Sequence, residues 1–105
     1  MTETDIIKGN ELLYDYFVGG KATAKAGSIG YDRAFGKIMP VFSKINYNET
    51  NYEIILYPCR VELKYENPDS DITIKTYEFM GETSEVFALF EACVDCVKLM
   101  NKERE

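Results

Sequence analysis

The sequence predicts a single α+β domain, residues 1–105, in which about three helices flank a small antiparallel sheet of two to four strands. Its 105 residues give room for one hydrophobic core and not for two. Apolar residues recur at helical spacing in three stretches, and between residues 52 and 80 the period changes to two, as it does in strands. The expected order is helix, helix, strand, strand, an optional further strand and helix, an order that an α/β/α sandwich would also fit.

The first helix is expected over about residues 5–18. Thr4 can cap its first turn, and Asp5 is favourable beside the positive end of the helix dipole. Gly19 and Gly20 predict its end, because glycine readily takes the left-handed conformation of a helix C-terminus. Residues 19–30 then form a basic, glycine-rich loop, which is long for a connector inside a compact domain.

The second helix is expected over about residues 32–46, with its apolar positions at helical spacing. Pro40 lies inside it and removes a backbone donor, while its ring presses toward the carbonyl of Gly36. We therefore predict that this helix is kinked.

Strands are expected over about residues 52–66 and 71–80, where apolar and charged residues alternate. Pro58 and the residue after it break or bulge the first of these ladders, because proline cannot donate to it. Residues 67–70 read as a turn. In the returning strand Tyr77 falls on the other parity from Ile72, which predicts a local bulge.

The last helix is expected over about residues 83–102 and carries a wide apolar stripe. Phe87 and Val94 lie to one side of that stripe. The helix is therefore either deeply buried or in contact with a second chain, and these two residues are the predicted interface of a homodimer.

The residue types favour a binding protein over an enzyme. The chain has no histidine, which removes the usual general base near neutral pH and most zinc sites. Cys93 and Cys96 form a CxxC pair in mid-helix with only Cys59 as a further thiol, too few ligands for structural zinc. We expect no catalytic residue, no metal and no cofactor.

The location is predicted to be the cytoplasm. An odd number of cysteines fits a reducing compartment. The acidic N-terminus lacks the pattern of a signal peptide, and no apolar run is long enough to cross a bilayer. No membrane partner is expected.

The basic loop is the best candidate site, because backbone amides and cations near a helix N-terminus can hold a phosphate. The predicted ligand-binding residues are Lys21, Lys25, Gly27, Ser28, Gly30, Tyr31 and Arg33. The ring of Tyr31 would stack on a base. Residues 19–45 carry a local balance of +4, whereas the whole chain has a net charge of −6. A small anionic, nucleotide-like ligand is therefore expected, and direct nucleic-acid binding is not. The alternative is that the loop is only a flexible connector.

Acidic residues on the strands and the last helix offer a second candidate surface, which could imitate a phosphate track and occupy a nucleic-acid-binding partner. They are Glu62, Glu66, Asp69, Asp71, Glu82, Glu85, Glu91 and Asp95. The alternative is an ordinary solvated face.

Several short motifs resemble those of a group of uncharacterised phage and prophage proteins of gut Bacteroidetes. They are Asn10-Glu11-Leu12-Leu13, Gly19-Gly20, Tyr31 before a helix that holds Met39-Pro40-Val41 and Lys44-Ile45, and a closing Glu85–Asn101 helix with Ala92. The group is similar in layout to the phage ABA sandwich domain, whose helices flank an antiparallel sheet. The resemblance implies an origin and a fold, and it supplies no catalytic residues.

Three functions follow as hypotheses. The leading one is a phage-encoded counter-defence factor, not an enzyme, that sequesters a small anionic nucleotide-like signal in the host cytoplasm. The first alternative is an acidic inhibitor that binds a host nucleic-acid-binding or defence protein. The second is a structural or assembly protein of the virion.

Overall fold

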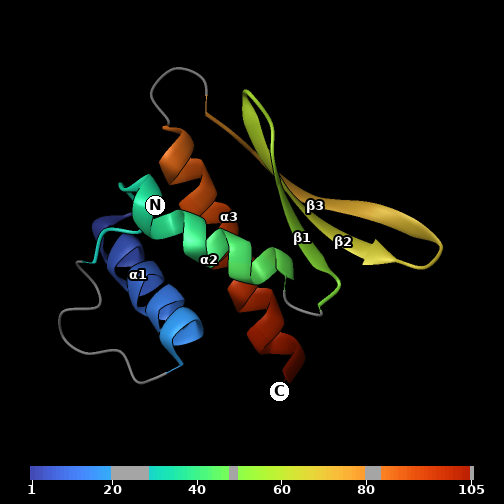
Figure 1. Ribbon diagram of the computed structural model, residues 1–105, viewed down its shortest axis with the longest axis horizontal. Coiled ribbons are helices and arrows are strands. Elements are labelled where there is room, and N and C mark those ends of the chain that lie inside the picture. The colour runs from blue at the N-terminus through green and yellow to red at the C-terminus, as the bar shows by residue number, and fades with distance from the viewer. Residues whose placement is uncertain (20–28, 48–49, 80–83, 105) are drawn as a thin grey trace.

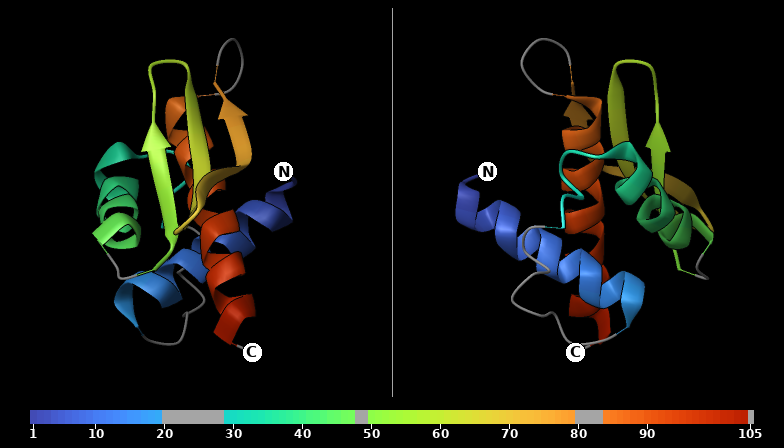
Figure 2. Two further views of the ribbon diagram at one scale, coloured as in Figure 1. Left: turned by 90° about the vertical axis from the view of Figure 1, so that its right-hand side faces the viewer. Right: turned by 60° about the vertical axis from the view of Figure 1, so that its left-hand side comes forward.

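The computed structural model describes residues 1–19, 29–47, 50–79 and 84–104 and confirms the α+β class. Helix α1 spans Glu3–Val18 and helix α2 spans Phe35–Tyr47. Strands β1 (Tyr52–Leu56), β2 (Arg60–Asn67) and β3 (Ser70–Glu78) follow, and helix α3 (Glu85–Arg104) comes last. Helices α2 and α3 cover one face of the sheet, and α1 packs on α3 from the side away from the sheet (Figures 1 and 2). An α/β/α sandwich would have helices on both faces, and the described residues place helices on one.

Helix α1 begins two residues earlier than predicted, because Thr2 is its N-cap and not Thr4. The Thr2 hydroxyl accepts a hydrogen bond from the Asp5 amide at 3.1 Å, and the Asp5 carboxylate accepts one from the Thr2 amide at 3.1 Å. This reciprocal capping box satisfies two backbone donors at once. Gly19 ends the helix as predicted, with φ +78° and its amide donating to the Asp15 carbonyl.

Helix α2 begins at Phe35 and not near residue 32, because the Arg33 amide donates to the Gly30 carbonyl and closes a turn there. Pro40 lies inside the helix as expected. The kink itself stays a prediction. Helix α3 begins at Glu85, where the Ser84 hydroxyl accepts a hydrogen bond from the Phe87 amide at 3.0 Å.

The sheet has the strand order β1-β2-β3, and both pairings are antiparallel. The predicted strand over residues 52–66 is in fact two strands, because the Tyr57 amide and the Arg60 carbonyl close a tight turn around Pro58. The predicted bulge is present in β3, where Leu63 pairs with Lys75 and Lys64 with Thr73, so that Ile74 is the extra residue. The bulge turns Tyr77 into the core and leaves Ile72 and Ile74 exposed.

Helix α3 forms the centre of the core, between the sheet and α1 (Figure 2). Its buried residues are Ala88, Leu89, Phe90, Ala92, Cys93, Val94, Cys96, Val97 and Met100. Leu13 from α1, Ile38 from α2 and Leu63 from β2 complete the same apolar cluster. Among the described residues, no helix is both long enough and apolar enough to span a bilayer.

Candidate functional site

Asn10 ties α1 to the segment that precedes α2. Its side chain is only 1% exposed. The Oδ1 atom accepts a hydrogen bond from the Tyr31 amide at 2.8 Å, and Nδ2 donates to the Ile6 carbonyl and to Asp32 Oδ1 at 3.0 and 3.1 Å. A buried amide with this many partners fixes the position of the backbone at Tyr31 against α1.

The structure describes three of the predicted ligand-binding residues, Gly30, Tyr31 and Arg33. Gly30 has φ +88°, which favours glycine at that position, and Arg33 is exposed. The predictions for Lys21, Lys25, Gly27 and Ser28 lie outside the described residues.

The stacking role expected of Tyr31 stays a prediction, and the burial of its ring speaks against it. Tyr31 is 4% exposed and belongs to the core cluster, so neither face of its ring is open to a base. Burial raises the pKa of its hydroxyl, and the nearby Tyr14 raises it further. Tyr31 is therefore a packing residue.

The interface predicted on α3 also stays a prediction, and the burial of Val94 speaks against that residue's part in it. Val94 is 1% exposed, and a Cβ atom built on Gly9 of α1 would lie 3.0 Å from Val94 Cγ2. Phe87 is half-buried, with its ring centroid 6.0 Å from that of Phe90. The wide apolar stripe is thus used within the chain, because α3 packs against the sheet and α1 at once.

The cysteine pair of α3 lies in the core. Cys93 and Cys96 are buried. Burial raises the pKa of Cys96 to about 12 and the pKa of Cys93 also rises, so both thiols stay protonated near neutral pH. Among the described residues, no group of three or more acidic or cysteine side chains is placed to hold a metal ion.

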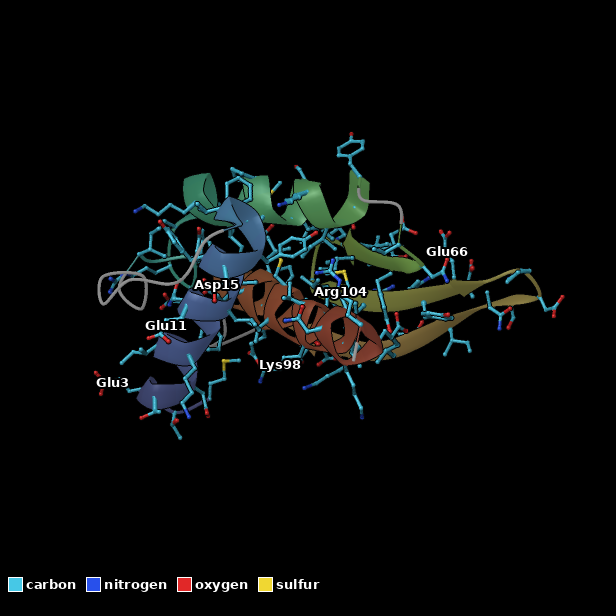
Figure 3. All side chains as sticks on the ribbon, turned by 90° about the horizontal axis from the view of Figure 1, so that it is seen from below. Glu3, Glu11, Asp15, Glu66, Lys98 and Arg104 are labelled. Carbon is cyan, nitrogen blue, oxygen red and sulfur yellow. The ribbon has the colours of Figure 1, made fainter. Side chains whose placement is uncertain are left out.

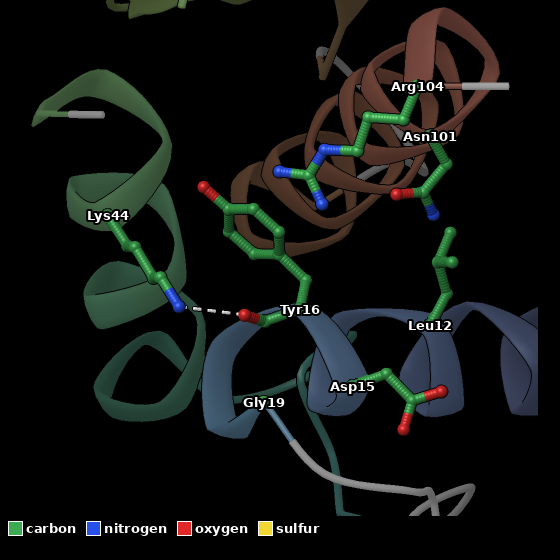
Figure 4. Close-up of a pocket in the computed structure, with 7 residues that line it drawn as sticks. All are labelled: Leu12, Asp15, Tyr16, Gly19, Lys44, Asn101 and Arg104. Atoms are coloured by element: carbon green, nitrogen blue, oxygen red, sulfur yellow. Dashed lines mark hydrogen bonds between the residues drawn. The ribbon is translucent and has the colours of Figure 1, made fainter. Parts of the chain in front are cut away.

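A pocket of about 370 Å³ opens where the C-terminal ends of α1 and α3 meet α2 (Figure 4). Its lining residues are Leu12, Asp15, Tyr16, Gly19, Lys44, Asn101 and Arg104. The Lys44 ammonium donates to the carbonyls of Tyr16 and Phe17 at 2.8 and 3.3 Å, and it lies 4.8 Å from the centre of the Tyr16 ring. Arg104 reaches into the pocket from α3, on the other side of that ring (Figure 4). The pocket therefore presents two cations and one carboxylate.

The face of the sheet that points away from the helices carries most of the acidic strand residues. Cross-strand register places five carboxylates on it, against the two cations Arg60 and Lys64. The five are Glu53, Glu62, Glu66, Asp71 and Glu78. We call this surface the open face.

The two cations of the open face are already engaged by one carboxylate. Arg60 Nε lies 2.8 Å from Glu62 Oε2, and Lys64 Nζ lies 3.9 Å from Glu62 Oε1. Within the described ranges, the other four carboxylates make no ion pair.

Three of those carboxylates crowd one another. Glu66 lies directly opposite Asp71 in the register, and Glu53 is close to both. Partial burial raises the pKa of Glu53, and its hydrogen bond to Glu66 and the charges of Glu66 and Asp71 raise it further, while Lys64 opposes them. Carboxylates that repel each other in this way favour a cationic partner.

Sequence reasoning missed several residues that matter at these surfaces. Glu53 was overlooked, although its alternation with Tyr52 and Ile54 places it on the same face as Glu62. Lys44 and Arg104 meet at one pocket only because the ends of three helices converge, and no pattern in the sequence signals that.

Comparisons with models of known protein families, with curated protein sequences and with solved structures find no match. The resemblance to phage proteins therefore stays a prediction.

Proposed function

We propose that this protein is a non-enzymatic binding protein whose open face engages a cationic polypeptide. The observation that carries the proposal is the set of four carboxylates without an ion pair among the described residues, on a sheet face that the described helices leave uncovered. Opposite charge brings such partners together quickly and sets their orientation.

The open face also has a small apolar and aromatic area beside the β1–β2 turn that could rest on a partner. Ile55 and Tyr57 are half-buried, and the Arg60 guanidinium lies 4.2 Å from the centre of the Tyr57 ring. A cationic surface that carries an aliphatic or planar group beside its charges would match this arrangement. Together with the resemblance to phage proteins, this favours the acidic-inhibitor hypothesis, in which a host nucleic-acid-binding or defence protein is occupied in the cytoplasm.

A matched pair of charge-neutralised variants tests the proposal. Glu66→Gln with Asp71→Asn removes two charges from the open face, and Glu3→Gln with Glu11→Gln removes two from α1, away from Glu66 (Figure 3). The probe is a short fluorescent peptide of alternating lysine and arginine, titrated at several salt concentrations.

We expect the open-face variant to weaken peptide binding about tenfold and to flatten its dependence on salt, because each lost charge reduces the attraction. The α1 variant should bind within about twofold of the wild type. Equal weakening by both variants would mean that only net charge matters, and the proposal would then be wrong.

A second candidate function is sequestration of a small anionic, nucleotide-like ligand in the pocket at the helix ends. The observation that favours it is the approach of Lys44 and Arg104 next to Gly19, where the basic segment of residues 19–45 begins. Two features oppose it. Asp15 lines the same pocket, and the C-terminal ends of α1 and α3 direct the negative ends of their dipoles there. We therefore place it second.

Equilibrium dialysis against adenosine and guanosine phosphates tests this second function. If the pocket is the site, Arg104→Gln should weaken nucleotide retention about tenfold. Lys102→Gln is the control, because Lys102 is also in the last turn of α3 but does not line the pocket, and it should leave retention unchanged. Retention that is equal in both variants, or no retention by the wild type, would remove this candidate.

A further inference from the structure

Tyr57 and Glu62 on the open face already hold a guanidinium group, that of Arg60. The Arg60 guanidinium lies 4.2 Å from the centre of the Tyr57 ring, and its Nε lies 2.8 Å from Glu62 Oε2. An aromatic ring and a carboxylate together suit a guanidinium, because its flat surface stacks on the ring while its N–H groups donate to the carboxylate. We call Tyr57 and Glu62 the guanidinium site, and the chain's own arginine occupies it.

The Glu62 carboxylate is held in position by contacts other than Arg60. Its side chain is only 12% exposed. Its Oε1 atom accepts a hydrogen bond from the Thr73 hydroxyl at 3.5 Å and lies 3.9 Å from Lys64 Nζ, whereas Arg60 bonds Oε2. Departure of Arg60 would therefore free Oε2 and one face of the Tyr57 ring, and it would leave the carboxylate oriented.

Arg60 can leave the guanidinium site at little cost. Its side chain is 41% exposed, and an ion pair with an exposed partner contributes little to stability. Glu78 lies directly opposite Arg60 in the register of β2 and β3, and it makes no ion pair with the residues that the structure describes. A displaced Arg60 thus has a second carboxylate to turn to.

We propose that an arginine of the cationic partner replaces Arg60 on the guanidinium site, and that Arg60 occupies the site until the partner binds. The inference rests on the proposed function and narrows its partner to a polypeptide that presents arginine. A lysine ammonium is a compact point charge without a flat surface to stack on the ring. The other carboxylates of the open face attract either cation, so the preference for arginine arises at Tyr57.

The test compares two fluorescent peptides of equal length and charge, one with arginine and one with lysine at every cationic position. The quantity measured is the ratio of their dissociation constants. Arg60→Ala should raise the preference for the arginine peptide at least about threefold, because it vacates the guanidinium site. Lys64→Ala is the matched control, since it removes the same charge beside the same carboxylate but leaves Arg60 on Tyr57. It should tighten both peptides equally.

A second substitution assigns the preference to the ring. Adding Tyr57→Leu to Arg60→Ala should bring the preference for arginine back to the wild-type value or below it, because the stacking surface is gone. A preference that rises equally in Arg60→Ala and Lys64→Ala would overturn the inference. The proposed function would still stand in that case if the Glu66 and Asp71 double variant weakens both peptides.

A further measurement tests the guanidinium site without any peptide. Methylguanidinium chloride is titrated into the protein, and the ring resonances of Tyr57 are followed by nuclear magnetic resonance. The shifts should be at least about threefold larger in Arg60→Ala than in the wild type, and methylammonium chloride should give no such difference. Equal shifts in the two proteins would overturn the inference. If methylguanidinium behaves as expected but neither peptide binds, the proposed function fails and the guanidinium site does not.

Discussion

Gly9 lies where α1 packs against Phe90 and Val94 of α3, and replacing it tests how tightly the two helices pack. A Cβ atom at this position would lie 2.7 Å from Phe90 Cζ and 3.0 Å from Val94 Cγ2. Carbon atoms in good contact are about 3.5–4.0 Å apart. Phe90 is completely buried, so either its ring must shift within the core or α1 must move away from it.

Two opposing effects set the size of the change in stability for Gly9→Ala. Alanine stabilises a helix by about 1 kcal/mol relative to glycine. Overpacking of a full core costs about 1–3 kcal/mol. We therefore expect a net loss of about 1 kcal/mol in the free energy of unfolding, and a melting temperature lower by about 4–8 °C.

Gly36→Ala is the matched control. Gly36 is also in a helix, but nothing lies within 4 Å of a Cβ atom built on it. This variant should gain up to about 1 kcal/mol, because only the propensity effect acts. Thermal unfolding followed by circular dichroism compares the two variants. If Gly9→Ala stabilised the protein as much as Gly36→Ala does, the close approach of α1 and α3 described above would be wrong.

Three further substitutions test the remaining contacts. Asn10→Ala should cost about 2–4 kcal/mol in urea unfolding, because it opens a cavity and leaves the buried Tyr31 amide without its acceptor; a cost below about 1 kcal/mol would contradict the role of Asn10. Glu53→Gln should stabilise the protein at neutral pH by about 0.2–1 kcal/mol. The folded state raises the pKa of Glu53 above its ordinary value of 4.5, so the gain in stability should fade as the pH falls through the raised pKa and then through 4.5, where the carboxyl is protonated in both states. A gain in stability that persists at a pH of about 3 would contradict the crowding of Glu53 with Glu66. Thr2→Ala should lower stability by about 1 kcal/mol through loss of the capping box, and its effect on hydrogen exchange should be confined to the first turn of α1.

The elements of the fold could be predicted because each has a local signal. Helical spacing, Pro58 and the parity change at Tyr77 are enough to predict the helices, the strand break and the bulge. The boundaries were less accurate. Thr2 and Thr4 both lie near the start of the first helix, but only Thr2 has an acidic residue three positions later. The reciprocal hydrogen bonds of that pair make Thr2 the N-cap.

The candidate surfaces were harder to predict, because they depend on which elements pack together. Nothing near Tyr31 in the sequence says that its ring is buried, since that follows from its anchorage to Asn10, far earlier in the chain. The wide apolar stripe of α3 fits burial within the chain and dimerisation equally well in the sequence. The packing of α1 against α3, which no local pattern signals, is what buries the stripe within the chain. Part of the predicted basic site lies outside the described residues.

The central position of α3 has a consequence for how the chain is made. Helix α3 is translated after α1, α2 and the whole sheet, yet all of them pack against it. Until it leaves the ribosome, the earlier elements expose the apolar surfaces that it later covers, and in that state they are open to chaperones and proteases. Translation-arrest force measurements should therefore detect folding only once the last turns of α3 have emerged. The protein would reach its native structure in a single late step, with no stable half-formed domain before it.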